Sequence, residues 1–170
     1  KEQKDYLDSL KLFIEAKTPC KVSDIELAII NLQSTRGSCD LVIVDYLQLL
    51  SPSTKSKQSR EVEVAEISRE LKNLAVKYHV PIIVLSQLSR ALESREDKRP
   101  MLSDLRESGA IEQDADVVMF LYRDEYYHPD SDRKNIGEVI IAKNRHGETG
   151  SVELVWLGEI QKFADKSREM

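Results

Sequence analysis

Residues Leu41–Leu50 read LVIVDYLQLL, an almost wholly apolar stretch with a single carboxylate, Asp45. A continuous apolar run of this kind is typical of a parallel strand that is covered on both faces. A second run, VPIIVL at residues 80–85, follows segment 60–78, whose apolar residues recur at three- and four-residue spacings. The spacing predicts an amphipathic helix, and the order strand, helix, strand predicts a right-handed βαβ unit.

The segments on either side of this unit extend an α/β pattern. The further elements that we predict are a short strand at Leu10–Ile14, a helix from an N-cap at Ser23 to Gly37, a short helix at Ser103–Gln113, a strand at Ala115–Tyr122, and a hairpin of strands 138–142 and 150–156. The sequence therefore predicts an α/β fold with a mainly parallel sheet that finishes in a C-terminal antiparallel hairpin.

Composition limits the classes of protein to which the chain can belong. Its 170 residues suit one domain, with 41% hydrophobic and 32% charged residues. We expect no membrane segment, since no apolar run approaches the roughly 20 residues that a spanning helix needs. The chain opens without a signal peptide, and Cys20 and Cys39 fit no metal pattern. Reduced thiols and a cytoplasmic location are expected.

The net charge of −5 argues against a protein that coats nucleic acid over its whole surface. The positive charge is nevertheless clustered, in the loop Lys55–Arg60 and again in segment 90–99. Local contact with a phosphate backbone therefore stays open.

Two polar residues stand where the predicted parallel strands end. Asp45 closes the apolar part of the first strand, and Gln87 follows the second. Ligands of α/β sheets bind beyond the carboxyl ends of the strands, so both residues are candidates for one site. Asp45 suits Mg²⁺, which favours carboxylates and phosphate oxygens, and Gln87 can sense a phosphate by hydrogen bonding. The alternatives are a carboxylate that caps the strand and an amide bonded to backbone.

The predicted hairpin tip carries Lys143 and Arg145, two cations separated by one residue. A point charge and a planar guanidinium together suit the neutralisation of a phosphoryl group. A solvated hairpin tip is the alternative. Glu61, Glu63 and Glu66 are candidate activating carboxylates by composition only, and a solvated helix face accounts for them better.

Segment 98–109, KRPMLSDLRESG, contains further phosphate-binding groups: Arg106, Ser108 and the backbone of Gly109. No aromatic residue interleaves with them. The segment therefore favours tracking of a nucleic-acid backbone over stacking on bases.

These pieces, in this order, resemble one known family. LVIVDYLQLL, REVEVAEISRELKNLAVKYHVPIIVLSQLSR, DKRPMLSDLRESGAIEQDADVVMFLYRDEYY and IIAKNRHGETG are similar to the RecA-like C-terminal motor domain of DnaB-type replicative helicases. The similarity runs from about Lys21 to Trp156. It implies a RecA-like P-loop NTPase core that couples ATP hydrolysis to translocation on single-stranded DNA and duplex unwinding.

The resemblance also implies residue roles. Asp45 matches the Walker B carboxylate that holds Mg²⁺, and Gln87 matches the glutamine that senses the γ-phosphate. Lys143 and Arg145 match cations that reach the nucleotide of the neighbouring subunit. The DNA-binding loop of the family is matched by Arg106, Glu107 and Gly109 and, with weaker support, by the basic loop Lys55–Arg60. A hexameric ring, primase and a helicase loader are the expected partners.

One departure from the family is clear: no G-x-x-x-x-G-K-[ST] loop occurs in the 170 residues. The catalytic glutamate and the N-terminal collar domain of the family are not matched either. We therefore expect residues 1–170 to be a partial motor domain, truncated on its N-terminal side and inactive as an ATPase alone. The alternatives are a non-catalytic module that binds single-stranded DNA or helicase subunits, and a RecA/RadA-type recombinase core.

Overall fold

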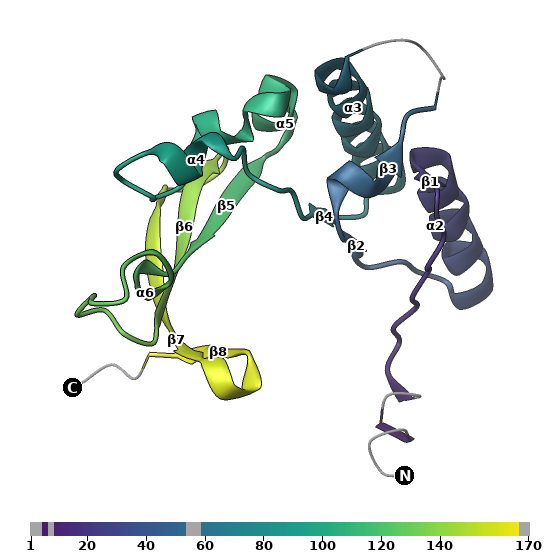
Figure 1. Ribbon diagram of the computed structural model, residues 1–170. Coiled ribbons are helices and arrows are strands. Elements are labelled where there is room, and N and C mark those ends of the chain that lie inside the picture. The colour runs from purple at the N-terminus through teal and green to yellow at the C-terminus, as the bar shows by residue number, and fades with distance from the viewer. Residues whose placement is uncertain (1–4, 7–8, 54–58, 167–170) are drawn as a thin grey trace.

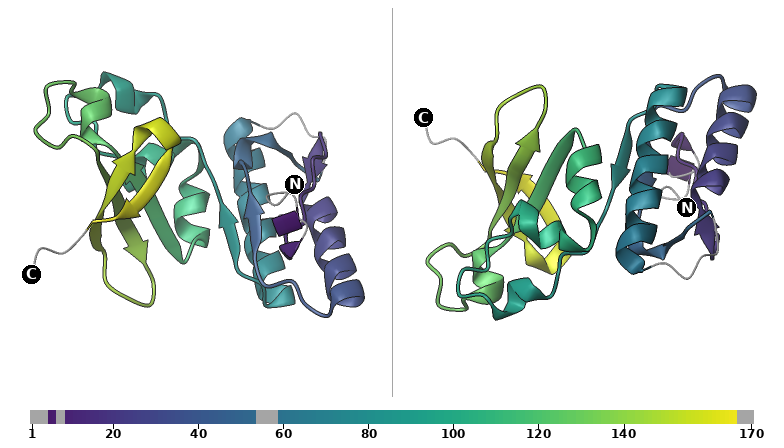
Figure 2. Two further views of the ribbon diagram at one scale, coloured as in Figure 1. Left: turned by 90° about the horizontal axis from the view of Figure 1, so that it is seen from below. Right: turned by 90° about the horizontal axis from the view of Figure 1, so that it is seen from above.

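The computed structural model describes residues 5–6, 9–53 and 59–166, with the side chains of 106–108 excepted. The chain forms two halves that are joined by the stretch after β4 (Figures 1 and 2). The first half holds β1 (Cys20–Lys21), α2 (Val22–Arg36), β2 (Val42–Val44), η1 (Leu47–Leu49), β3 (Leu50–Ser51), α3 (Arg60–Tyr78) and β4 (Ile82–Val84). The second half holds four longer strands and several short helices.

The predicted βαβ unit forms the centre of the first half. Strands β2 and β4 pair in parallel, with Val42 opposite Ile82 and Val44 opposite Val84. Helix α3 connects them and has the predicted bounds. The apolar residues of α3 at three- and four-residue spacings are the ones that become buried: Val64, Ile67, Leu71 and Leu74. They pack with residues of α2, β2 and η1 into one core.

The predicted strand at 41–50 is wrong in its length. Only β2 (Val42–Val44) is extended, and the chain then bends at Asp45 into the 3₁₀ helix η1. Leu47 and Leu50 are buried, whereas Leu49 is 54% exposed. A three-residue spacing of buried side chains suits a 3₁₀ turn, because a strand would bury alternate residues. Ile43 is also 60% exposed, so β2 is not covered on both faces.

The N-terminal elements differ from the prediction in two details. Residues 11–17 have no regular structure, so the strand predicted at Leu10–Ile14 is not formed. Helix α2 begins one residue early, because the Asp24 carboxylate accepts the Lys21 backbone N–H at 2.9 Å and Ser23 lies inside the helix. The predicted end is confirmed, with Gly37 in the left-handed conformation at φ 85°.

The second half is an antiparallel sheet in the order β5-β6-β7-β8. Its strands are β5 (Val117–Tyr122), β6 (Ile136–Asn144), β7 (Gly150–Leu157) and β8 (Lys162–Asp165). The α/β class and the predicted hairpin are confirmed, the hairpin as β6 and β7. A mainly parallel sheet is not formed by the described residues, because β5 pairs antiparallel with β6. Strand β8 was not predicted; Phe163 holds it against Trp156, with ring centroids 4.7 Å apart.

Short helices connect the halves and cover the second sheet. They are α4 (Ala91–Ser94), η2 (Leu102–Ser108), α5 (Gly109–Asp114), α6 (Asp124–Tyr127) and η3 (Gly158–Ile160). The helix predicted at Ser103–Gln113 is thus confirmed as two consecutive pieces, η2 and α5. Cys20 and Cys39 are free thiols, as predicted. Among the described helices, none has the length and apolar character needed to cross a membrane.

A buried carboxylate fastens the loop before η2 to the second sheet. Glu138 of β6 is 6% exposed, and both of its oxygens accept hydrogen bonds from Arg99, at 3.0 and 2.5 Å. Arg133 and Ser151 donate to it as well, at 3.2 and 3.1 Å. The Arg99 guanidinium, followed by the other charged and hydroxyl donors, lowers the pKa of Glu138 below its ordinary 4.5.

Glu138→Gln keeps the shape of this side chain and removes its charge. We expect the free energy of unfolding at neutral pH to fall by about 2 kcal/mol, the scale of hydrogen bonds to a charged group. Because the folded-state pKa of Glu138 is lowered, its contribution is present above pH 4.5 and is lost as pH falls through the folded-state pKa. Denaturant unfolding at neutral and at acidic pH measures both effects.

The matched control is Glu159→Gln on η3, where the side chain is exposed. The difference in unfolding free energy between wild type and Glu138→Gln should shrink in acid, whereas Glu159→Gln should match wild type throughout. A difference that stays constant with pH would contradict this account of Glu138.

Candidate functional site

The carboxyl ends of β2 and β4 bring Asp45 and Gln87 to the same edge. The two chains stay bonded beyond the strands, because Leu85 donates its N–H to the Val44 carbonyl at 2.9 Å and accepts from the Leu47 N–H at 2.8 Å. Asp45 and Gln87 are both exposed there. This is the placement expected from the strand order.

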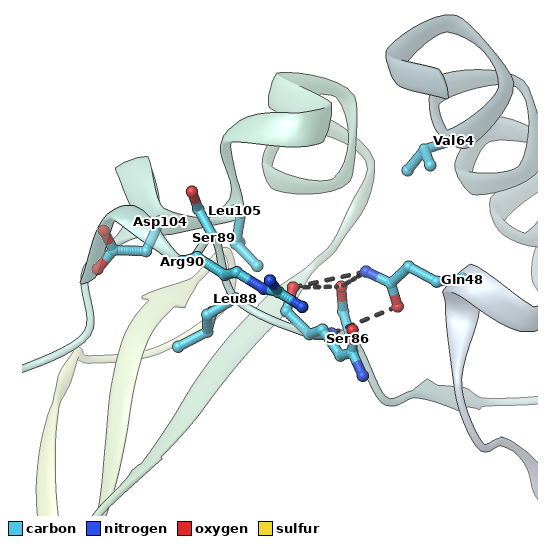
Figure 3. Close-up of a pocket in the computed structure, with 9 residues that line it drawn as sticks. Gln48, Val64, Ser86, Leu88, Ser89, Arg90, Asp104 and Leu105 are labelled. Carbon is cyan, nitrogen blue, oxygen red and sulfur yellow. Dashed lines mark hydrogen bonds between the residues drawn. The ribbon is translucent and has the colours of Figure 1, made fainter. Parts of the chain in front are cut away.

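Gln48, which the sequence reading missed, joins the two strand ends. Its side-chain amide donates to Ser86 Oγ at 3.2 Å and to the Gln87 carbonyl at 3.5 Å (Figure 3). Its side-chain oxygen accepts the Gln87 N–H at 3.4 Å. Arg60, the first residue of α3, donates to the Gln48 carbonyl at 2.8 Å. A lone glutamine in an apolar run carried no signal of this role.

A cavity of about 260 Å³ lies beside this junction. Gln48 and Val64 line it from the first half, residues 86–90 form its floor, and Asp104 and Leu105 close it from η2. The space therefore lies between the strand end that bears Gln87 and the helix that bears the predicted DNA-binding residues (Figure 3).

The stretch between β4 and η2 is organised by Asp104, whose side chain is 6% exposed. Its carboxylate accepts the Met101 N–H at 2.8 Å and an Arg95 guanidinium N–H at 3.0 Å. Its carbonyl accepts the Ser89 N–H at 2.9 Å. One buried acid thus holds the residues that follow Gln87 against η2.

The predicted DNA-binding residues lie at the junction of η2 and α5. The backbone of Arg106 and Glu107 belongs to η2, and their side chains lie outside the described part of the structure. Gly109 begins α5, and a Cβ added to it would meet no atom within 4 Å. Its backbone is therefore open on that side. In the basic loop Lys55–Arg60, residues 55–58 lie outside the described residues.

Lys143 and Arg145 lie together at the C-terminal end of α5. Lys143 Nζ donates to the carbonyl oxygens of Glu112 at 2.5 Å and Ala115 at 2.7 Å. Arg145 donates to the Gln113 carbonyl at 2.5 Å and to the Asp116 carboxylate at 3.3 Å. Both cations thus contact the helix end rather than standing free at a hairpin tip. Among the described residues, no hydrogen bond or ion pair joins either cation to Asp45 or Gln87.

Asp116 is a second residue that the sequence reading did not single out. It accepts from Lys72 of α3 at 2.5 Å as well as from Arg145, and the Arg145 N–H bonds its carbonyl at 2.9 Å. The hydrogen bond from Lys72, together with the charges of Lys72 and Arg145, lowers the pKa of Asp116. Asp114 and Asp116 alternate just before β5, and this pairing of acids was the available signal.

The glutamates of α3 behave as a solvated face where the structure describes them. Glu63 accepts from Arg60 at 2.9 Å on the helix surface, and Glu61 is exposed. Within the described residues, no group of three or more metal-ligating side chains gathers. Asp45 therefore fits Mg²⁺ as one carboxylate ligand beside phosphate oxygens, and not as part of an all-protein cage.

Comparison with known proteins agrees with this geometry. The family description "DnaB-like helicase C terminal domain" matches residues 1–165. The chain is 51% identical over 162 residues to the replicative DNA helicase DnaB of Geobacillus stearothermophilus, and 49% identical over 162 residues to the replicative DNA helicase DnaC of Bacillus subtilis. Each match covers 95% of this chain and 36% of the relative.

Two solved structures superpose on the chain with a TM-score of 0.90 and 44% identity, and each covers 98% of it. One is a DnaB-like replicative helicase studied with primase, of which the chain matches 41%. The other is a separate ATPase domain, of which it matches 58%. The chain thus spans about a third of the length of the curated relatives and has the RecA-like fold of these structures. It belongs to the DnaB-like helicase C-terminal domain family.

Proposed function

We propose that this chain is the distal part of a hexameric, ATP-driven replicative DNA helicase motor. The observation that carries the proposal is that Asp45 and Gln87 leave paired parallel strands at one edge, in a chain whose family match spans residues 1–165. The phosphate-binding loop and the catalytic glutamate belong, in this proposal, to a preceding part of the protein. The 36% coverage of the relatives supports that placement.

In the intact motor, the residues of this chain have separate tasks. Asp45 holds Mg²⁺, and Gln87 donates a hydrogen bond to the terminal phosphate. When bound, ATP and Mg²⁺ supply the transferable phosphoryl group and the charge that offsets it. Gln48 fixes the backbone of Gln87, so the position of the Gln87 side chain is passed to the segment that Asp104 fastens to η2.

The remaining tasks involve partners. Lys143 and Arg145 serve the nucleotide of the neighbouring subunit, and their partial exposure beside the β6–β7 turn supports such a reach. Arg106, Glu107 and the open backbone of Gly109 follow single-stranded DNA, with the loop Lys55–Arg60 as a second contact. We place the motor in the cytoplasm, with primase and a helicase loader as partners. Family membership favours this function over a recombinase core.

Alone, the 170-residue chain should bind without turnover, because it lacks a phosphate-binding loop. We expect no release of phosphate from ATP by the purified chain. A phosphate-release assay with and without single-stranded DNA measures this, and the Asp45→Ala chain is its control. Release that disappears in Asp45→Ala would contradict the proposed division of the site.

In the full-length protein, Asp45 and Arg145 should act on the same nucleotide from different subunits. Asp45→Ala and Arg145→Ala rings are each expected to lose at least about 100-fold in ATP hydrolysis, as for other removed charge-stabilising groups. Mixed rings should recover activity, because some interfaces then join an intact Asp45 to an intact Arg145.

A ring that carries both substitutions in every subunit is the control and should stay inactive after the same mixing procedure. Native mass spectrometry establishes that mixed rings form. Mixed rings without recovered hydrolysis would contradict a site that is shared between subunits.

Single-stranded DNA binding should depend on salt through the η2 segment. Arg106→Ala is expected to weaken binding and to reduce the slope of log affinity against log salt by about 0.7 for each lost phosphate contact. Arg69→Ala, an exposed arginine on α3, is the matched control and should leave the slope unchanged. Fluorescence anisotropy across a salt series measures both slopes. Equal slopes for Arg106→Ala and wild type would argue against this DNA contact.

A further inference from the structure

The C-terminal end of α5 takes up most of the hydrogen-bonding capacity of Lys143. An ammonium group has three N–H donors and no acceptor. Two carbonyls lie at 2.5 and 2.7 Å from Nζ, those of Glu112 and Ala115, and the Gln113 carbonyl lies at 3.5 Å. The last carbonyls of a helix lack partners within the helix and favour a cation. Lys143 therefore acts as the cap of α5.

Arg145 contacts the same helix end but keeps donors in reserve. A guanidinium has five N–H donors. Arg145 uses one on the Gln113 carbonyl and one on the Asp116 carboxylate. Its side chain is 44% exposed. Arg145 can therefore donate to a phosphate while it stays on Asp116, whereas Lys143 must give up a carbonyl to do so.

The helix that Lys143 caps continues directly from the predicted DNA-binding segment. Helix α5 starts at Gly109, the residue after η2 ends. The other fastenings of α5 are to α3: Ser68 donates to Asp114 at 2.8 Å, and Lys72 donates to Asp116 at 2.5 Å. A change at the α5 end is thus passed to η2 with no intervening loop.

We propose that Lys143 is a positioning residue whose ammonium is exchanged between the carbonyls at the end of α5 and the nucleotide of the neighbouring subunit. This inference rests on the proposed function. In the nucleotide-free state Lys143 caps α5 and fixes η2. Nucleotide across the interface withdraws the cap, so α5 and η2 loosen in the subunit that supplies Lys143. By linkage, DNA that orders η2 weakens the hold of Lys143 on that nucleotide by the same factor.

The capping is tested first, in the nucleotide-free full-length protein, by hydrogen exchange of peptides that cover residues 109–116. Lys143→Met, which keeps the length of the side chain and removes its donors, is expected to raise exchange there about two- to fivefold, the scale of a cation at a helix end. Lys162→Met, an exposed lysine on β8, is the matched control and should leave exchange unchanged.

Lys143→Arg retains a cation and its donors, and it should keep most of the protection. This second variant separates loss of the cap from a general loss of folding, as does unchanged exchange in the β6–β7 peptides. Exchange in Lys143→Met equal to that of wild type would overturn the capping.

The exchange of Lys143 is tested by adding a non-hydrolysable ATP analogue to assembled rings and measuring analogue binding separately. Exchange of residues 109–116 should rise in wild type and should not rise further in Lys143→Met. Bound analogue with unchanged or lower exchange in wild type would overturn the inference and leave the proposed function standing. An analogue that does not bind would overturn both, while the nucleotide-free comparison still decides the capping.

Discussion

The in-register parallel pairing of β2 and β4 is the constraint on which the site depends. Only this pairing brings the chain after Val44 next to the chain after Val84, and hence Asp45 near Gln87. The pairing is held by α3, whose residues Val64 and Ile67 are almost fully buried against it. A slip of one residue would turn the strand side chains to the opposite face and move one polar residue away from the edge.

The second half is tied to this unit through side chains and not through a shared sheet. Helix α3 bonds Asp114 and Asp116 at the end of α5. That end also holds Lys143 and Arg145. The helix that sets the spacing of β2 and β4 therefore also sets the position of the two cations. In a ring, such a connection lets one subunit's own nucleotide edge and its contact with the neighbouring site respond to each other.

Local periodicity carried much of this architecture. The spacing of Val64, Ile67, Leu71 and Leu74 predicted α3 with its correct bounds, and Gly37 predicted the end of α2. The prediction failed where burial depends on distant partners. The run at 41–50 reads as one strand, but the core accepts Leu47 and Leu50 at a three-residue spacing, which a 3₁₀ turn provides.

The site was predictable only where strand order dictated it. Asp45 and Gln87 follow from the βαβ unit, since parallel strands end at one edge. Gln48 and Asp116 do not, because their bonds to Ser86 and Lys72 span 38 and 44 residues of sequence. The sequence indicated Lys143 as an anion contact, and it carried no signal that the end of α5 already occupies the same ammonium.

The central claim is that this chain contributes two different edges to nucleotide sites between subunits. The most direct test is the structure of the full-length ring with Mg²⁺ and a non-hydrolysable ATP analogue. We predict the nucleotide beside Asp45 of one subunit, with the Arg145 guanidinium of its neighbour within hydrogen-bonding distance of the phosphates. Nucleotide bound away from Asp45, or beside Asp45 with no Arg145 from the adjacent subunit, would contradict the account.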